Sequence, residues 1–293
     1  MPIALTDAPR DPGRRLDDHY DAASASAGRP LLARLREAFL AAGRDPGCLS
    51  LDDVAGIDQL HLGGRSASRA LAALGELRGG ERVLDVGCGT GGASRLLAAE
   101  YGCEVIGVDI TAAFVEVAGW LGAATGLAER SRFVCSDAAR VPLAAGGVEV
   151  VWCQHALMNM PQVPRVLAEW RRLLAPGGRV LLHELVAGDN PEPLALPVPW
   201  ASTPATSHLR SRERLERAMA LAGFEPFAVA DVTDAALAWR QAPGRRDGAS
   251  EAAGLPGPAL IFGAEFARMG RNLRDNLAAG KVRVLQGGWR RTR

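Results

Sequence analysis

Residues 84–92, LDVGCGTGG, are the strongest local signal of the fold in this chain. An apolar run ends here in glycines, and apolar side chains then recur at helical spacing, which predicts a strand, a tight loop and a helix. Glycines at a strand exit let the backbone approach a ligand closely, because no Cβ intervenes. Gly87, Gly89 and Gly92 match the G-x-G-x-x-G spacing of dinucleotide-binding loops, but this spacing alone does not identify the cofactor.

Three acidic residues stand where predicted strands end. Asp85 lies two residues before Gly87, where a carboxylate would repel a pyrophosphate but would suit a ligand that carries an ammonium group. Asp109 ends the next strand, 20 residues after Gly89, and is placed to accept hydrogen bonds from ribose hydroxyls. Asp137 follows the third predicted strand. Open α/β sheets bind ligands at these strand ends, although each Asp could instead be a turn or cap residue.

Strands and helices alternate regularly along the centre of the chain. We expect strands at residues 82–86, 104–108, 132–135, 148–152 and 179–185, with helices at 91–101, 111–125 and 162–174. Beyond them we expect a helix at 211–222, a strand at 225–232, a helix at 262–279 and a strand at 282–285. Such alternation with short connections predicts an α/β fold with a doubly wound, Rossmann-like, mostly parallel seven-stranded sheet.

Two further regions flank or interrupt this core. Residues 1–78 are expected to form an N-terminal helical cap region, and residues 79–293 the Rossmann-like core. Residues 188–210 are rich in proline and irregular, which is typical of a functional insertion, and we expect a lid there.

Composition narrows the partners and the compartment. The chain has 293 residues, 48% of them hydrophobic, and a formal net charge of +1, so it lacks the basic character of a nucleic-acid binder. Five scattered cysteines without a CxxC pair indicate a reducing compartment. We find no apolar run long enough for a signal peptide or a membrane span. We therefore expect a cytoplasmic protein that binds neither membrane nor nucleic acid, and we leave a homodimer open.

Four motifs resemble, in order and spacing, those of class I S-adenosylmethionine-dependent methyltransferases. They are LDVGCGTGG, VIGVDIT, SDAARVPL and LLAPGGRVLLHE, and the resemblance covers roughly residues 80–187. Upstream, residues 58–64, DQLHLGG, resemble the pre-motif of the ubiquinone/sarcosine-dimethylglycine-type small-molecule subgroup. Residues 197–200, PVPW, resemble that subgroup more loosely.

The resemblance implies a set of contacts with S-adenosyl-L-methionine, whose product is S-adenosyl-L-homocysteine. The methionyl part would meet Asp85 and the glycine loop, and the ribose would meet Asp109. The implied cofactor-binding residues are Gln59, Gly64, Asp85, Gly87, Gly89, Asp109, Ile110, Asp137, Ala138 and Gln154.

Residues 153–161, CQHALMNMP, leave the fourth strand beside the expected methyl group. His155 is a candidate general base because an imidazole titrates near neutral pH, although it could instead only hydrogen-bond backbone or cofactor. Tyr20 could place its hydroxyl near the methyl. Met158 and Trp200 are candidate acceptor-binding residues, with a core role as the alternative for Met158. His183-Glu184 lacks the H-E-x-x-H spacing, so we expect no metal.

The expected acceptor is a small, largely apolar specialised metabolite of the natural-product kind, methylated on C, N or O. This expectation rests on the apolar lid. Alternatives are an N-methyltransferase of small amines of the sarcosine/dimethylglycine type, an NAD(P)-dependent oxidoreductase, and a non-catalytic cofactor-binding or partner module. A nicotinamide titration would identify the oxidoreductase, and trace methylation of any acceptor would exclude the non-catalytic module.

Overall fold

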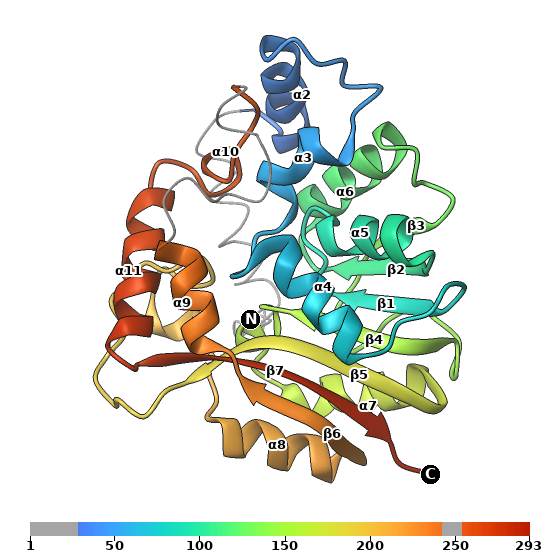
Figure 1. Cartoon of the computed structure of the whole chain (residues 1–293), viewed down its shortest axis with the longest axis vertical. Coiled ribbons are helices and arrows are strands. Elements are labelled where there is room, and N and C mark those ends of the chain that lie inside the picture. The colour runs from blue at the N-terminus through green and yellow to red at the C-terminus, as the bar shows by residue number, and fades with distance from the viewer. Residues whose placement is uncertain (1–28, 242–253) are drawn as a thin grey trace, which may run out of the picture.

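A computed structural model describes residues 29–241 and 254–293 and shows one seven-stranded sheet (Figure 1). The strand order is β3-β2-β1-β4-β5-β7-β6, and β7 runs antiparallel to both of its neighbours. The predicted α/β fold with a mostly parallel seven-stranded sheet is therefore confirmed. The strands are β1 Arg82–Val86, β2 Glu104–Asp109, β3 Ser131–Cys135, β4 Val148–Gln154, β5 Leu174–Ala187, β6 Phe224–Asp231 and β7 Val282–Arg291.

Helices cover both faces of the sheet. In chain order they are α2 Leu31–Ala41, α3 Leu51–Asp58, α4 Gly64–Leu74, α5 Gly92–Tyr101, α6 Ala112–Ala124, α7 Val163–Leu173, α8 Arg212–Leu221, α9 Thr233–Gln241, α10 Ala259–Phe262 and α11 Phe266–Ala278. Helices α4 and α5 pack on one face, and α7 and α8 pack on the other. Two short 3₁₀ turns, η1 Leu157–Asn159 and η2 Pro204–Thr206, lie in connecting segments.

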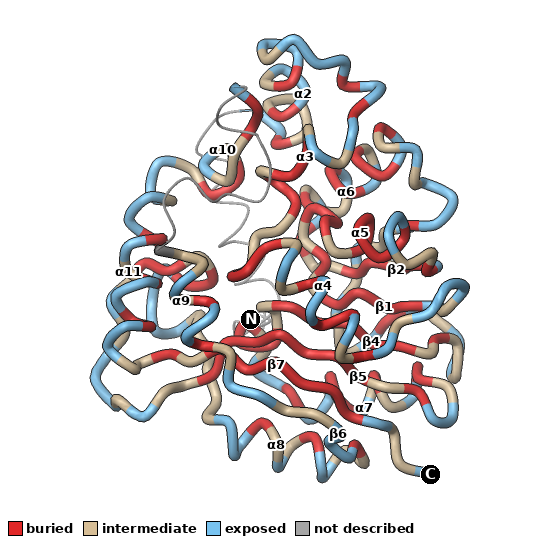
Figure 2. Tube along the Cα trace, in the orientation of Figure 1, coloured by how far each residue is buried: buried red, intermediate tan, exposed pale blue. Residues whose placement is uncertain are grey.

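The central strands read as continuous apolar runs because both of their faces are buried. In β1, Leu84 packs toward α7 while its neighbour Val83 packs toward α5. In β4, Val151 and Trp152 divide between the two faces in the same way. Figure 2 shows these strands buried along most of their length, whereas the outer sides of the helices are exposed.

The C-terminal part departs most from the prediction. Helices α9 and α10 were not expected. The helix predicted at 262–279 is observed as α11, which begins at Phe266, because Gly263 (φ 76°) ends α10 just before it. Strand β7 continues well past residue 285. A Cβ on Gly287 would lie 2.7 Å from the Trp289 ring, and one on Gly288 would lie 2.2 Å from the Phe227 ring. The two glycines make room for aromatic rings, and they also weaken the strand pattern in the sequence.

Segments outside the sheet add two apolar clusters that shape the site. Helices α2 and α6 meet where Phe39 contacts Trp120 at 6.0 Å between ring centroids. Residues 188–210 are irregular apart from η2, as predicted, and Val198 and Trp200 are buried in a cluster with α11. Among the residues that the structure describes, no helix is both long and apolar enough to cross a membrane.

Candidate active site

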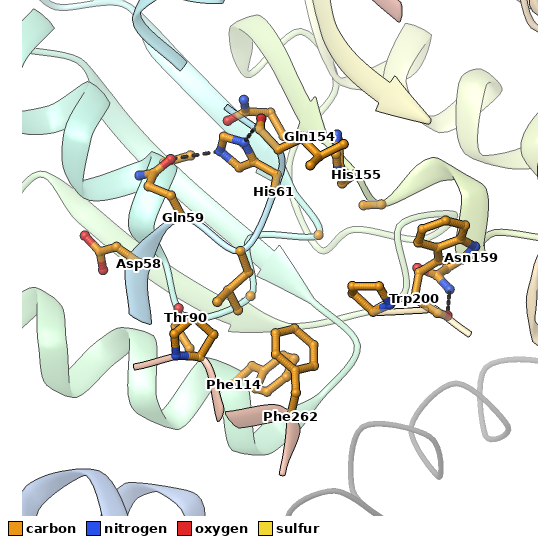
Figure 3. Close-up of a pocket in the computed structure, with 18 of the residues that line it drawn as sticks. Asp58, Gln59, His61, Thr90, Phe114, Gln154, His155, Asn159, Trp200 and Phe262 are labelled. Atoms are coloured by element: carbon orange, nitrogen blue, oxygen red, sulfur yellow. Dashed lines mark hydrogen bonds between the residues drawn. The ribbon is translucent and has the colours of Figure 1, made fainter. Parts of the chain in front are cut away.

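A cavity of about 960 Å³ opens at the carboxyl ends of β1, β2, β3 and β4. Its other walls come from the end of α3, the start of α4, residues 199–200 and helices α9 to α11. In Figure 3, Gln59, His61, Gln154 and His155 lie on one side of this space, opposite Phe114 and Phe262.

The glycines of residues 84–92 have different tasks. Gly87 has φ 72°, and a Cβ there would lie 2.3 Å from the Cβ of Ala156, so the loop after β4 lies directly against it. A Cβ on Gly92 would lie 1.9 Å from the backbone oxygen of Asp58, so α5 can begin there only without a side chain. Gly89 has φ 53° and faces open space on the cavity side. Gly89 is therefore the glycine at which backbone can come closest to a ligand.

Asp109 ties the end of β2 to the glycine loop. Its two carboxylate oxygens accept hydrogen bonds from the backbone N–H groups of Gly89 and Thr111, both at 2.9 Å. Burial raises the pKa of Asp109, while these hydrogen bonds lower it. Each carboxylate oxygen has a lone pair left over, so Asp109 can still accept from ligand hydroxyls in the cavity.

Asp85 is a buried carboxylate without a cationic partner in direct contact among the described residues. Only 2% of its surface is exposed, and Oδ2 accepts a hydrogen bond of 2.6 Å from the Ser94 hydroxyl. Burial raises the pKa of Asp85 to about 6, opposed by Ser94 and supported by the nearby charge of Asp109. A cationic ligand group would favour the ionised form of this carboxylate.

A buried ion pair between Arg95 and Asp58 joins the two helices that flank the glycine loop. Arg95, which is fully buried on α5, donates from Nη2 to Oδ1 of Asp58, the last residue of α3. Burial raises the pKa of Asp58, and the Arg95 charge opposes that shift. The pair joins α3 to α5 and so positions Gln59, which follows Asp58 directly.

Two glutamines present unused amide groups. Gln59 Oε1 contacts His61 Nε2 at 2.8 Å, and it accepts from Ser68 Oγ at 2.9 Å. Gln154 Oε1 accepts from Trp152 Nε1 at 2.9 Å. Within the described part of the chain, the buried amide nitrogens of both glutamines have no hydrogen-bond partner. Because an unpartnered buried donor is costly, both residues are suited to a ligand with acceptor oxygens.

Three histidines gather at the end of β4. The ring of His155 stacks on that of His183 at 5.1 Å, and His61 lies edge-on to both at 5.8 Å. Burial lowers the pKa of His61 to about 3 and that of His183 to about 4, and it lowers the pKa of His155 well below its usual value. All three rings are therefore neutral near pH 7. Among the described residues, no group of His, Cys, Asp and Glu could hold a metal ion.

His155 itself is held in an unusual conformation. Its φ is +49°, a region that side-chain-bearing residues rarely adopt, and its backbone N–H donates to the carbonyl of His183 at 2.9 Å. Its ring lines the cavity, and Nε2 is buried without a hydrogen-bond partner in the described residues. Backbone strain of this kind is often found at functional sites.

Glu184 holds the loop that carries His155. Its carboxylate accepts from the backbone N–H groups of Ala156 at 3.1 Å, Leu157 at 2.6 Å and Leu185 at 2.8 Å. Burial raises the pKa of Glu184 to about 7, against the effect of these hydrogen bonds. Asn159 then ties the same loop to the lid, since its Nδ2 donates to the carbonyl of Trp200 at 2.8 Å.

The structure brings together all the described residues predicted for the site. The ten predicted cofactor residues line the cavity, as do His155, Met158 and Trp200. Their roles remain predictions. Asp137 lies at the exposed edge, where Oδ1 accepts from the N–H of Ala139 at 2.8 Å. Tyr20 lies outside the described residues.

Several lining residues were not predicted. Five of them come from helices late in the chain: Arg240, Phe262, Phe266, Arg271 and Arg274. Phe114 comes from α6, just after β2. Trp239 lines the cavity as well. His61 lies within the quoted stretch DQLHLGG, but its relevance emerges only from its contacts with His155 and His183.

Comparison with known proteins identifies the central part of the chain. Residues 84–182 match the family described as methyltransferase domain. The chloroplastic tocopherol O-methyltransferase of Arabidopsis thaliana is 37% identical over 102 residues, which are 35% of this chain and 29% of that protein. Methyltransferase GfsG of Streptomyces halstedii is 30% identical over 185 residues, 62% of this chain and 66% of that protein. The chain thus spans less than two thirds of the length of these relatives.

Solved structures share the fold over most of the chain. The [4+2]-cyclase SpnF superposes with a TM-score of 0.62 at 25% identity, covering 83% of this chain and 92% of that one. The geranyl diphosphate C-methyltransferase of Streptomyces coelicolor A3(2), solved with S-adenosyl-L-homocysteine, superposes with a TM-score of 0.67 at 19% identity. The match covers 98% of this chain and 100% of that one. Residues 84–182 of this chain therefore form a methyltransferase domain.

Proposed function

We propose that the chain is an S-adenosylmethionine-dependent methyltransferase that acts on a small, largely apolar specialised metabolite. One observation carries this proposal. A single cavity holds a buried carboxylate without a contacting cation, Asp85, a strand-end carboxylate, Asp109, and two unused glutamine amides, Gln59 and Gln154. These groups are complementary to an ammonium, a ribose and a carboxylate, respectively.

The residues present fit the cofactor. Asp109 would accept from the ribose hydroxyls and Asp85 would face the methionyl ammonium, while Gln59 and Gln154 would donate to the methionyl carboxylate. Gly89 leaves open space on the cavity side, where a larger side chain would intrude. Ile110 and Ala138 supply apolar surface beside Asp109 and Asp137 for a flat base. When bound, the cofactor supplies a methyl group on a sulfonium.

The chain's own contribution is to position the acceptor and exclude water, because the leaving group is a neutral thioether. His155 is neutral and its Nε2 is unpartnered in the described residues, so it can accept a proton from the acceptor. Its lowered pKa makes it a weak base, and a role in positioning the acceptor fits the same geometry. Tyr20, which lies outside the described residues, remains proposed as a second group near the methyl.

The domain organisation and the cellular location are also proposals. We propose residues 1–78 as a cap region, 79–293 as the core, and a cytoplasmic location. None of the five cysteines forms a disulfide in the described part of the chain, and Cys48 and Cys135 are exposed, which fits a reducing compartment. The near-zero net charge supports a small-molecule acceptor over nucleic acid. We propose no membrane contact, and a homodimer is proposed as an oligomeric state to test.

A second candidate is a protein of this fold that binds the cofactor but transfers no methyl group. The likeness to SpnF, a [4+2]-cyclase, favours it, since that protein shares the fold at 25% identity. A third is N-methylation of small amines of the sarcosine/dimethylglycine type, the subgroup that DQLHLGG resembles. Methylation of an apolar acceptor would contradict both.

The test is a screen of acceptors with isotope-labelled methyl on the cofactor, read by mass spectrometry. We expect label in an apolar small molecule. His155→Ala should then lower turnover while cofactor affinity changes little, because His155 faces the acceptor. His208→Ala is the matched control, since His208 is partly buried but does not line the cavity. A cofactor that binds while no acceptor is ever labelled would favour the non-transferring candidate.

A further inference from the structure

We propose that the methyl acceptor is an apolar molecule that carries an anionic group, and that arginines on α9 and α11 bind this group. The inference deepens the proposed function and rests on it. It concerns the part of the cavity lined by the lid and by α9, α10 and α11, which we call the acceptor half: Met158, residues 199–200, Trp239, Arg240 and those residues of 257–274 that line the cavity.

Charge is divided between the two halves of the cavity. Every acidic residue in the described lining comes from one part of the chain: Asp58, Asp85, Asp109 and Asp137. Every basic residue other than histidine comes from another part: Arg240, Arg271 and Arg274. The acidic half matches the cationic ammonium and sulfonium of the proposed cofactor, which leaves the basic half for the acceptor.

Three of the acidic residues also form ion pairs or hydrogen bonds within the protein. Asp58 is paired with Arg95, and Asp109 accepts two backbone N–H groups. Asp85 is covered on one side by Ser94. No carboxylate of the described lining lies in the acceptor half, so an amine acceptor would be protonated there without a counter-charge.

The guanidinium of Arg240 lies against α11 at a glycine, Gly270. A Cβ on Gly270 of α11 would lie 1.9 Å from Nη2 of Arg240. Glycine inside a helix is less stable than alanine by about 1 kcal/mol, so its presence at the centre of α11 calls for a local reason. Here the glycine lets the guanidinium of Arg240 rest on the helix surface in the cavity wall.

Arg271 follows Gly270 and brings a second guanidinium to the same wall. Within the described part of the chain it forms no ion pair, whereas Arg274, one turn further on, contacts Asp275 at 2.9 Å. Arg268, one turn before, pairs with Glu265 and does not line the cavity. Arg271 is therefore the guanidinium of α11 with the fewest competing contacts. Arginine's planar fork suits carboxylates and phosphates alike.

Aromatic and apolar side chains line the same cavity as these arginines and His155. They are Phe114, Met158, Trp200, Trp239, Phe262 and Phe266. Such walls bind an apolar body, and neutral histidines at the inner end would face its reacting atom. The cavity volume is at the upper end of the roughly 300–1,000 Å³ typical of ligand pockets, which leaves room for an acceptor beside the cofactor.

The test uses three amphiphiles of one chain length: decanoate, decyl phosphate and decylamine. Protein saturated with S-adenosyl-L-homocysteine is titrated with each, and Trp fluorescence reports binding because Trp200 and Trp239 line the cavity. We expect decanoate or decyl phosphate to bind at least about tenfold more tightly than decylamine. The tighter of the two shows whether the group is a carboxylate or a phosphate.

Arginine variants locate the subsite. Arg271→Gln should weaken binding of the anionic probe about threefold, because Arg271 is exposed and its charge is screened by water. The double variant Arg240→Gln/Arg271→Gln should weaken it about tenfold. Arg271→Glu should reverse the preference toward decylamine. Arg268→Gln is the matched control on the same helix and should change nothing. Equal or tighter binding of decylamine, or no binding of either anion, would overturn the proposal.

Cofactor affinity separates this proposal from the proposed function. All the arginine variants should bind S-adenosyl-L-homocysteine as the unmodified protein does. If the unmodified protein binds no S-adenosyl-L-homocysteine, the proposed function fails; if it binds that molecule but shows no anion preference, only the acceptor subsite fails.

Discussion

The two halves of the cavity are built in different ways. In the cofactor half, strand ends and backbone N–H groups fix the polar side chains, as Asp109 shows with its hydrogen bonds to Gly89 and Thr111. In the acceptor half, side chains of α9, α10, α11 and the lid meet across segments far apart in sequence. Sheet geometry determines the positions of the side chains in the first half, whereas those in the second half depend on how separate elements pack.

The largest expected effect is the loss of cofactor affinity when Asp109 is replaced. Asp109→Ala removes the ribose acceptor and also releases the N–H of Gly89, so the dissociation constant for S-adenosyl-L-homocysteine should rise about 10- to 100-fold. Isothermal titration calorimetry measures it. Asp231→Ala is the matched control, because Asp231 likewise ends a strand, β6, and accepts the N–H of Thr233 at 2.8 Å, but does not line the cavity. Equal losses for both variants would contradict the central place given to Asp109.

Lowering the pH should reduce cofactor affinity by a smaller factor than Asp109→Ala does. The pKa of Asp85 is raised to about 6 in the folded protein, and the ionised form faces the methionyl ammonium. Affinity for S-adenosyl-L-methionine should therefore be full above about pH 6 and fall up to about tenfold per pH unit below it. Asp85→Asn should bind more weakly and lose this pH dependence. A variant that retains the same profile would remove Asp85 from the interaction.

The smallest expected effect on cofactor affinity comes from Glu184, which holds the loop that carries His155 between the two halves of the cavity. Glu184→Gln leaves one of three backbone N–H groups facing an amide donor, so the free energy of unfolding should drop by about 1–3 kcal/mol in urea. Because the displaced loop carries His155 and Met158, turnover should fall while affinity for S-adenosyl-L-homocysteine changes by less than about threefold. Glu149→Gln, at a half-exposed ion pair with Arg82, should cost about 1 kcal/mol or less. A larger loss of cofactor affinity than of turnover would contradict this role for Glu184.

The same contrast explains what the sequence could predict. The glycine loop, Asp85 and Asp109 were predictable because a strand, a turn and the next strand end encode them within about 25 residues of chain. Strand β7 was predicted too short because Gly287 and Gly288 make room for the rings of Trp289 and Phe227, which no local pattern reveals.

The acceptor half could not be predicted in the same way. Arg240, Phe262 and Arg271 read in the sequence as ordinary helix residues, and only packing brings them to the cavity that His155 lines. His155 was predicted at the site, but its left-handed backbone and its stacking on His183 depend on contacts across β4 and β5. Burial, and not sequence position, then makes the rings neutral.

The central claim is that the strand-end half of the cavity binds an adenosyl cofactor. Calorimetric titration of the unmodified chain with S-adenosyl-L-homocysteine tests it most directly. We predict saturable binding of one molecule per chain. A titration without heat, at temperatures on both sides of any point where the binding enthalpy passes through zero, would contradict the claim.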